Sequence, residues 1–345
     1  MKFFPKVISF LVFFSVALFA QTVTTPRVSP PAEVKQGVGL AYVGITYHSP
    51  AANGRKVWGE LVPYGSIWRA GANDNTVVTF SHDAKVEGKK IAAGSYGFHV
   101  IPNENEWTLI FNSVNSAWGS FFYDQSKDVL RVRVKTEEAP HRENLAYYFD
   151  NISTSKVTAY LDWAGKRASF SVVYDDKAVT VESFRSELVS LAWYNWTGPW
   201  QAANYCINNN TNLEEAKTWL ERSITLNRNF SNLSTKSAFL ELEGKEEEAI
   251  KIKAEAFDIA TEAQLNAYGY QRMGAGELDE ALRVFKMNVK NHPESWNVYD
   301  SYAEALDKKG DIVNAEKNYK KALEMAPENQ KGRINGILTR YEGAN

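Results

Sequence analysis

The chain has 345 residues, of which 44% are hydrophobic and 23% are charged, and its formal net charge is −2. This length suits two globular domains of about 150 residues each, and the composition excludes disordered and collagen-like classes. Because no cluster of basic residues is visible, we expect no nucleic-acid partner.

Residues 1–20 have the pattern of a secretory signal peptide. Lys2 and Lys6 flank the start of an apolar run at residues 7–20, which is shorter than the roughly 20 residues of a membrane span. We expect cleavage after Ala20, export to the periplasm or cell surface of a bacterium, and no membrane span in the mature chain. An uncleaved anchor is the alternative. Cys206 is the only cysteine, so no intramolecular disulfide can form, which suits a periplasmic protein.

After a lead-in at residues 21–36, residues 37–176 have the period-two pattern of β-strands. In the run at residues 130–135, for example, Leu130, Val132 and Val134 alternate with basic residues. About nine such runs, separated by turn residues, predict an antiparallel β-sandwich or barrel. Glu87 and Gly88 in VEGKKI mark a hairpin turn between two of the strands.

Residues 58–73 read WGELVPYGSIWRAGAN and form a long glycine-containing connection between two predicted strands. Its aromatic and polar side chains suit a pocket for a small polar ligand, such as a sugar, a peptide end or a small acid. The candidate ligand-binding residues are Trp58, Glu60, Tyr64, Trp68, Arg69 and Asn73.

The alternative is that the same connection folds over a core of its own. Trp58 and Trp68 then pack beneath it, Arg69 pairs with Glu60 or with backbone carbonyls, and Asn73 holds a turn. We favour this interpretation for the two tryptophans. Arg69 and Asn73 therefore carry the ligand-binding hypothesis.

The histidines suggest a metal site only weakly. His48 and His99 are expected to point from the same side of the sandwich and, with Glu60, would supply three ligands. The sequence contains no HxH or HExxH motif, and its other histidines lie far apart. We therefore favour no metal and expect no cofactor.

Enzyme signatures are absent from the sequence. No GxSxG elbow, Walker loop or GxGxxG is present, which argues against a serine hydrolase or a nucleotide-dependent enzyme. Carboxylates on β-domain loops leave a glycoside hydrolase open, since the sequence cannot give the separation that this chemistry requires. These carboxylates are Glu60, Asp74, Asp83 and Asp124.

Residues 177–211 form an aromatic-rich helical junction. Trp193, Trp196 and Trp200 are expected to attach the first helical hairpin to its neighbour, the β-domain. Gly198 and Pro199 are expected to break any helix between Trp196 and Trp200.

Residues 212–345 contain a repeat. The segments LEEAKTWLERSI, EEEAIKIKAEAF, LDEALRVFKMNV and IVNAEKNYKKAL place an alanine at the same position, with separations of 33, 32 and 34 residues. The alanines are Ala216, Ala249, Ala281 and Ala315. A small residue repeated at this period predicts an α-helical tetratricopeptide-repeat solenoid.

Several motifs resemble a known family. GRKVWGELVPYGSIWRAGAN, VEGKKIAAGSYGFHVIP, WGSFFYD and DVLRVRVK are similar to the secreted bacterial domain of unknown function 2911 (DUF2911). NWTGPWQAANYC followed by tetratricopeptide repeats is similar to a subgroup of that family. The resemblance implies no reaction, substrate or catalytic residue.

These features favour an exported binding or scaffold protein over an enzyme. The repeats are expected to engage a protein or peptide, and the β-domain a small polar ligand. The alternatives are a hydrolase-like envelope enzyme acting on carbohydrate through the β-domain, and a purely structural envelope protein.

Overall fold

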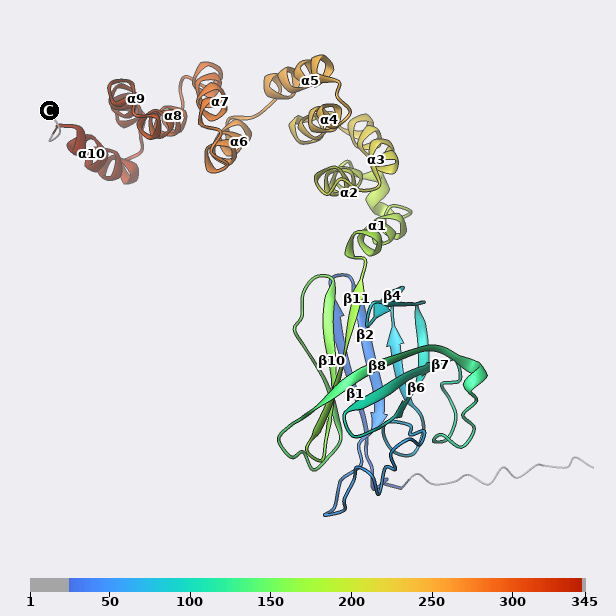
Figure 1. The fold of residues 1–345 in the computed structure, drawn as a ribbon. Coiled ribbons are helices and arrows are strands. Elements are labelled where there is room, and N and C mark those ends of the chain that lie inside the picture. Colours follow the sequence, from blue (N-terminus) through green and yellow to red (C-terminus); the bar gives the residue numbers. More distant parts are fainter. Residues whose placement is uncertain (1–24, 343–345) are drawn as a thin grey trace, which may run out of the picture. The chain divides into compact units, whose positions relative to one another are not determined.

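The computed structural model describes residues 25–342, which divide into two compact units at Asp176 (Figure 1). The first unit is built from strands and the second from helices, as the change of period predicts. The signal peptide expected at residues 1–20 lies outside the described residues.

The described part of the first unit contains eleven strands in one antiparallel arrangement. Their order is β1-β2-β3-β6-β7-β8-β11-β10-β9, with β4 paired to β11 and β5 paired to β4. The strands are β1 (Pro31–Val38), β2 (Ala41–His48), β3 (Thr76–Phe80), β4 (Ala84–Val86), β5 (Lys89–Ile91), β6 (Gly94–Ile101), β7 (Glu106–Asn112), β8 (Asp128–Glu138), β9 (Ala146–Asp150), β10 (Lys156–Trp163) and β11 (Lys166–Tyr174).

Strand β8 connects the two halves of this sheet. It pairs with β7 along most of its length and with β11 only through residues 136–138, so the sheet folds over on itself. Rings from both halves meet in the core, where Phe98 of β6 lies 5.2 Å from Phe111 and 5.7 Å from Phe170 of β11. Alternating side chains of both halves thus bury one apolar layer, which confirms the predicted β-sandwich or barrel class.

The predicted start of the β-domain at residue 37 is wrong. Strand β1 begins at Pro31 and pairs with β2 over its whole length, from Pro31 opposite His48 to Val38 opposite Ala41. A proline is tolerated at the start of an edge strand because its missing N–H faces no partner. The hairpin predicted at Glu87 and Gly88 is confirmed, since both have the positive φ, 48° and 77°, of a two-residue turn between β4 and β5.

Four tryptophans form a cluster beneath the connection that joins β2 to β3. Trp58 lies with its ring centre 4.6 Å from Trp107 of β7 and 5.9 Å from Trp163 of β10, and Trp68 stacks on Trp163 at 5.9 Å. Each indole N–H donates to a backbone carbonyl, including that of Trp58 to Trp163. The tryptophan cluster therefore buries large apolar rings without an unsatisfied donor.

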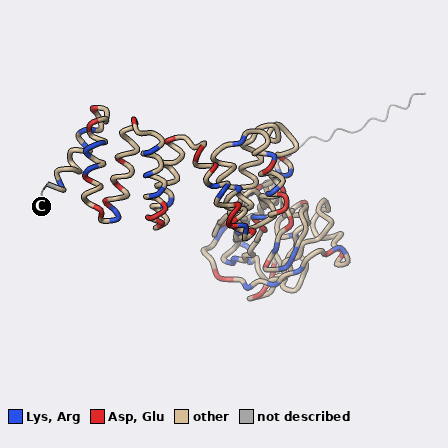
Figure 2. The backbone as a smooth tube through the Cα atoms, turned by 90° about the horizontal axis from the view of Figure 1, so that it is seen from above, with Lys and Arg blue, Asp and Glu red and all other residues tan. Residues whose placement is uncertain are grey.

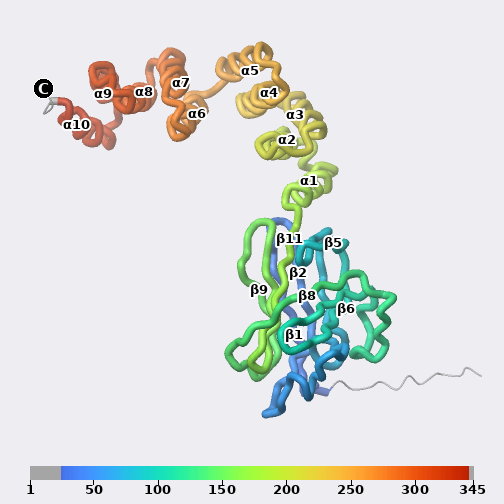
Figure 3. The backbone as a smooth tube through the Cα atoms, in the orientation of Figure 1, coloured from blue at the N-terminus to red at the C-terminus, as the bar shows by residue number. Residues whose placement is uncertain are grey.

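The described part of the second unit contains ten α-helices. Helices α2 to α9 pair as four antiparallel hairpins, and Figure 3 shows the hairpins following one another along the chain. The helices are α1 (Asp176–Glu187), α2 (Thr197–Asn208), α3 (Leu213–Leu226), α4 (Phe230–Leu242), α5 (Glu246–Asp258), α6 (Glu262–Gly274), α7 (Leu278–Asn291), α8 (Trp296–Lys309), α9 (Ile312–Met325) and α10 (Glu328–Glu342).

The repeated alanines hold the helices of each hairpin together. They lie on the second helix of every hairpin and are all at most 1% exposed: Ala216 on α3, Ala249 on α5, Ala281 on α7 and Ala315 on α9. A larger side chain at these positions would force the paired helices apart, because helix axes pack at 8–10 Å. The predicted tetratricopeptide-repeat architecture is confirmed.

The boundary predicted between the junction and the repeats is displaced. Helix α2 pairs with α3, so the first hairpin begins at Thr197 and residue 212 lies inside it. Gly198 and Pro199 do not break this helix, because they lie in its first turn, where a proline N–H has no intrahelical partner. Trp193 and Tyr205 pack into the core formed by α1 to α5.

We predict that replacing Trp58 destabilises the first unit far more than replacing an exposed tryptophan. Trp58→Ala removes a ring that is 7% exposed and should lower the free energy of unfolding by about 3–5 kcal/mol. Trp118→Ala is the matched control, because Trp118 is 49% exposed. Thermal unfolding of the full chain, with hydrogen exchange of β6 and β7 as the local probe, measures both. Equal losses in the two variants would contradict the cluster's role.

Candidate functional site

The six ligand-binding candidates of residues 58–73 do not form one site. Trp58 and Trp68 belong to the tryptophan cluster. Glu60 is exposed and pairs with Lys56 at 3.1 Å, not with Arg69. The ring of Tyr64 covers Gly59. Arg69 and Asn73 lie where the connection reaches β3, beside Asp74 and the carbonyl of Ser29 respectively.

A polar cluster forms where the connection reaches β3. Nη1 of Arg27 donates to Oδ2 of Asp74 at 2.7 Å and lies 3.4 Å from Nε2 of His48. The Arg27 guanidinium also lies over the Trp118 ring, 5.5 Å from its centre. Asp74 forms an isolated antiparallel bridge with Trp118, which fixes the carboxylate beside the indole. We call Arg27, His48, Arg69, Asp74 and Trp118 the arginine cluster.

Asn73 holds the backbone around the arginine cluster, and its amide already donates to a backbone carbonyl instead of facing a ligand. Its Nδ2 donates to the carbonyl of Ser29 at 3.1 Å, and its carbonyl accepts from the N–H of Gly119. Its φ is 58°, a conformation that asparagine adopts more readily than most residues. Asn73 therefore positions the neighbouring segments.

Arg69 enters the cluster with an unsatisfied side chain. Its Nε is buried and has no hydrogen-bond partner among the described residues. Nη1 lies 2.9 Å from the position that a Cβ on Gly119 would occupy, so only glycine at 119 leaves the guanidinium its present place. A buried arginine donor without an acceptor is unusual, because such groups are almost always paired.

The arginine cluster contains more positive than negative charge. Burial lowers the pKa of Arg69, and Asp74 only partly opposes this. Burial also lowers the pKa of His48; Asp74 raises it, and Arg27 and Arg69 both lower it further. Two guanidinium groups thus share one carboxylate, whose side chain is 48% exposed.

His99 lies on the same outer face of the sheet as His48 but in a separate environment. It is 3% exposed beneath residues 113–124, and its Nδ1 lies 2.9 Å from the hydroxyl of Ser120. Tyr123 contacts the imidazole edge-on and donates to Asp128 at 2.8 Å. Burial lowers the pKa of His99 to about 4, with Asp128 opposing the shift. An imidazole with so low a pKa is a weak base at neutral pH, so the Ser120 contact does not make an activated nucleophile.

The structure does not gather the suggested metal ligands. His48 contacts the arginine cluster, His99 contacts Ser120, and Glu60 pairs with Lys56. Across residues 25–342, no three His, Cys, Asp or Glu side chains come together as a group that could hold a metal ion.

The loop carboxylates serve local structural roles. Asp74 pairs with Arg27, Asp83 accepts from the N–H of Ala93, and Asp124 caps the short 3-10 helix at Gln125–Lys127. Glu60 pairs with Lys56. None of these contacts joins two of the four carboxylates.

The helical unit carries a groove of about 390 Å³ on the first helices of its hairpins. Residues of α2, α4 and α6 line it, together with Lys253 and Phe257 of α5. The aromatic side chains are Trp200, Phe230, Phe257 and Tyr268; the polar ones include Asn204, Asn208, Ser234, Glu241 and Gln271. The groove therefore combines apolar walls with hydrogen-bonding groups, the usual composition of a peptide-binding surface.

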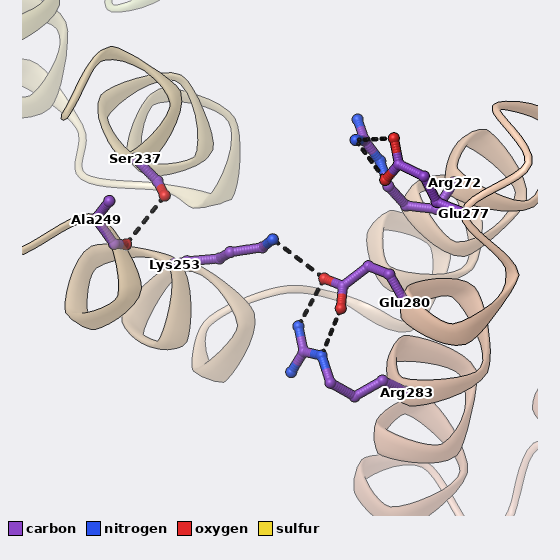
Figure 4. A network of polar contacts seen from close by, with 7 residues as sticks. All are labelled: Ser237, Ala249, Lys253, Arg272, Glu277, Glu280 and Arg283. Carbon is purple, nitrogen blue, oxygen red and sulfur yellow. Dashed lines mark hydrogen bonds and ion pairs between the residues drawn. The ribbon is translucent and has the colours of Figure 1, made fainter. Parts of the chain in front are cut away.

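Ion pairs fix the end of this groove (Figure 4). Nζ of Lys253 on α5 lies 3.1 Å from Glu280 on α7, and Arg283 donates twice to the same carboxylate at 2.7 and 2.8 Å. These bonds, with Arg283 first, lower the pKa of Glu280 to about 2 although its burial opposes them. Arg272 lies over the Tyr268 ring and pairs with Glu277. The second and third hairpins are thus connected by charge as well as by packing.

Each of the two units contains residues that match a known family. Residues 29–172 match the family model described as "Protein of unknown function (DUF2911)", and residues 297–329 match a tetratricopeptide-repeat model. The chain carries a DUF2911 domain followed by tetratricopeptide repeats. The resemblance inferred from the sequence motifs is confirmed.

Two solved structures each resemble part of the chain. A crystal structure of MamA has 18% identity and a TM-score of 0.28, covering 46% of this chain and 92% of its own. A structure of pilF from Pseudomonas aeruginosa has 14% identity and a TM-score of 0.25, covering 40% and 64%. No curated protein matches the chain.

Sequence reasoning missed two members of the arginine cluster in the DUF2911 domain. Arg27 was assigned to the lead-in, and Trp118 lies in an irregular segment with no strand pattern. The only available signal was the motif WGSFFYD, which puts exposed aromatics beside a glycine. Pairing between Asp74 and Trp118 depends on the folded sheet, so spacing in the sequence does not reveal it.

We predict that His99 makes the DUF2911 domain sensitive to acid. Its folded pKa of about 4 lies below the ordinary 6.5, so its contribution is fully present above pH 6.5 and is lost as the pH falls toward 4. The loss is on the order of 3 kcal/mol. Histidine C–H resonances in the NMR spectrum, assigned with His99→Gln, should show one titration near pH 4. His141→Gln, at an exposed position, is the control; a His99 titration near 6.5 would contradict the prediction.

Proposed function

We propose that this protein is an exported scaffold protein whose tetratricopeptide repeats hold an extended segment of a partner protein. The groove across α2, α4 and α6 is the observation that carries this proposal. Repeats of this type imply protein–protein interaction, and stacked hairpins make long concave surfaces rather than reaction centres.

The lining of the groove supports an extended peptide. Asn204 and Asn208 lie one turn apart on α2, and an amide side chain offers both a donor and an acceptor to a peptide backbone. Thr235 of α4 accepts from Trp200 Nε1 at 2.9 Å and donates to Asn204 at 3.1 Å, which holds the two helices in register. Tyr268 and Phe230 supply ring faces for apolar side chains of the partner.

Charge does not select the partner by itself. Figure 2 shows acidic and basic residues interspersed along the helices, and the whole chain has a net charge of −2. Within the groove, Lys253 and Arg272 already pair with Glu280 and Glu277. The fit of side chains to the aromatic walls therefore decides which peptide binds.

The DUF2911 domain contributes a second binding function in this proposal, for a small polar ligand at Arg69. Export is part of this proposal because residues 1–20, which lie outside the described residues, have the sequence pattern of a signal peptide. Among residues 25–342, no helix is long and apolar enough to cross a membrane.

We predict that a photo-crosslinking residue in the groove captures a partner in the producing cell. Gln271→benzoylphenylalanine places the probe on an exposed groove residue of α6, and the partner peptide is identified by mass spectrometry. A synthetic copy of that peptide should bind the full chain, and Tyr268→Ala should weaken it at least about tenfold, as for an aromatic hot spot.

The control places the same probe at Lys286, which is exposed on α7 and outside the groove. Crosslinks to the same partner from both positions, or unchanged peptide affinity in Tyr268→Ala, would contradict binding in the groove.

We predict that the mature protein begins at Gln21. Mass spectrometry of the N-terminus after cell fractionation measures this, and the protein is expected in the periplasmic or surface fraction. An intact Met1 in protein recovered from the cytoplasm would rule out export.

A further inference from the structure

The arginine cluster has a donor that nothing in the described chain satisfies. Nε of Arg69 is buried without a partner, and Asp74, the carboxylate that acts on it electrostatically, instead accepts from Arg27 at 2.7 Å. A buried guanidinium donor without a partner destabilises the fold by its desolvation penalty, and buried donors are almost always paired. Such a donor therefore indicates that a ligand supplies the acceptor.

Other arginines of the same domain show how a structural arginine is satisfied. Arg167 donates twice to Asp162, from Nε and Nη2, at 2.7 Å each. Arg55 donates to the carbonyls of Ala51 and Ala52. Nε of Arg131 also lacks a hydrogen-bond partner, but it lies 3.3 Å from Oδ2 of Asp128. Arg69 differs from all three, because its buried Nε has no hydrogen-bond partner and no ion pair with a carboxylate is seen for it among the described residues.

Glycine and aromatic residues shape the surroundings of this guanidinium. Nη1 of Arg69 and the ring of Phe121 both lie within 3.3 Å of where a Cβ on Gly119 would be. Trp118, on the other side of Gly119, is 49% exposed and lies beneath Arg27. Two cations therefore lie beside partly exposed rings, an arrangement that suits an anion carrying an apolar group.

We propose that Arg27 and Arg69 bind a carboxylate or phosphate group of a small ligand, and that the ligand's apolar part lies against Trp118. The planar forks of the two guanidinium groups suit either oxyanion, and the partly exposed Asp74 limits affinity by competing for Arg27. This inference rests on the ligand-binding role proposed above for the DUF2911 domain and is independent of the groove, so the crosslinking result can stand if it fails.

Isothermal titration of the full-length chain tests the site with phenylacetate, phenyl phosphate and neutral phenylacetamide. At least one of the anions should bind, and phenylacetamide should bind at least about tenfold more weakly, because it cannot form charge-assisted bonds. The stronger of the two anions identifies the ligand chemistry. Binding of neither anion below about 10 mM, or equal binding of phenylacetamide, would overturn the proposal.

Variants assign the binding to the cluster. Arg69→Gln and Arg27→Gln should each weaken the preferred anion at least about tenfold, while Arg133→Gln, an exposed arginine on β8, should leave it unchanged. Because the Arg27 side chain is 47% exposed, its variant keeps the test decisive if Arg69→Gln does not fold. Trp118→Ala should weaken the same anion several-fold. Equal losses in Arg133→Gln would overturn the site, and unchanged affinity in Trp118→Ala would overturn its apolar half.

Discussion

The packing of the tryptophan cluster decides where the side chains of the long β2–β3 connection point. The connection has little regular structure, yet Trp68 exchanges two backbone hydrogen bonds with Val100 of β6, at 2.8 and 2.7 Å. Val100 is fully buried, so its paired residue also faces the core. Because successive side chains in extended chain point to opposite faces, Arg69 is directed to the outer face, where His48 and Gly119 lie. Burying the indoles thus places the guanidinium.

Close approach of a second segment completes that outer face. A Cβ on Gly97 would lie 2.2 Å from the carbonyl oxygen of Val114, so residues 113–124 rest directly on the backbone of β6. Asn75 holds the same segment through bonds to Ala117 and Gly119. The result buries His99 and presents Trp118 beside Asp74. A larger residue at 97 would separate the segment from the sheet, and with it one wall of the arginine cluster.

The repeat architecture was predictable because its signal is local. Alanines at 33, 32 and 34 residues mark the tight contact of each hairpin, and the structure buries all of them. The hairpin turn at Glu87 and Gly88 was equally local. Helix α2 was misplaced because Gly198 and Pro199 were treated as breakers, whereas the first turn of a helix tolerates a proline. Strand β1 begins at Pro31, before the predicted residue 37, and a proline is tolerated at the start of an edge strand.

The arginine cluster was only partly predictable because its members come together through the sheet. Arg69 could be predicted because it lies in a segment rich in aromatic residues, polar residues and glycine. Arg27 could not, because it contacts Asp74 and His48, which are 47 and 21 residues away in the sequence. Some charged pairs of the helical unit are easier to predict, because both residues lie on the same helix. Arg283 pairs with Glu280 one turn away.

Arg69 of the DUF2911 domain differs from the paired cations of the helical unit. In the helical unit, cations meet carboxylates of neighbouring helices: Lys253 pairs with Glu280, Arg185 with Glu215 at 2.5 Å, and Arg228 with Glu255. Such pairs fix the geometry of the hairpins. A peptide in the groove is then recognised through its shape and its hydrogen bonds. In the DUF2911 domain the buried Nε of Arg69 has no hydrogen-bond partner, and the nearby carboxylate of Asp74 already pairs with Arg27. A cation kept in place without an acceptor is preorganised for one, which lowers the cost of binding an anion.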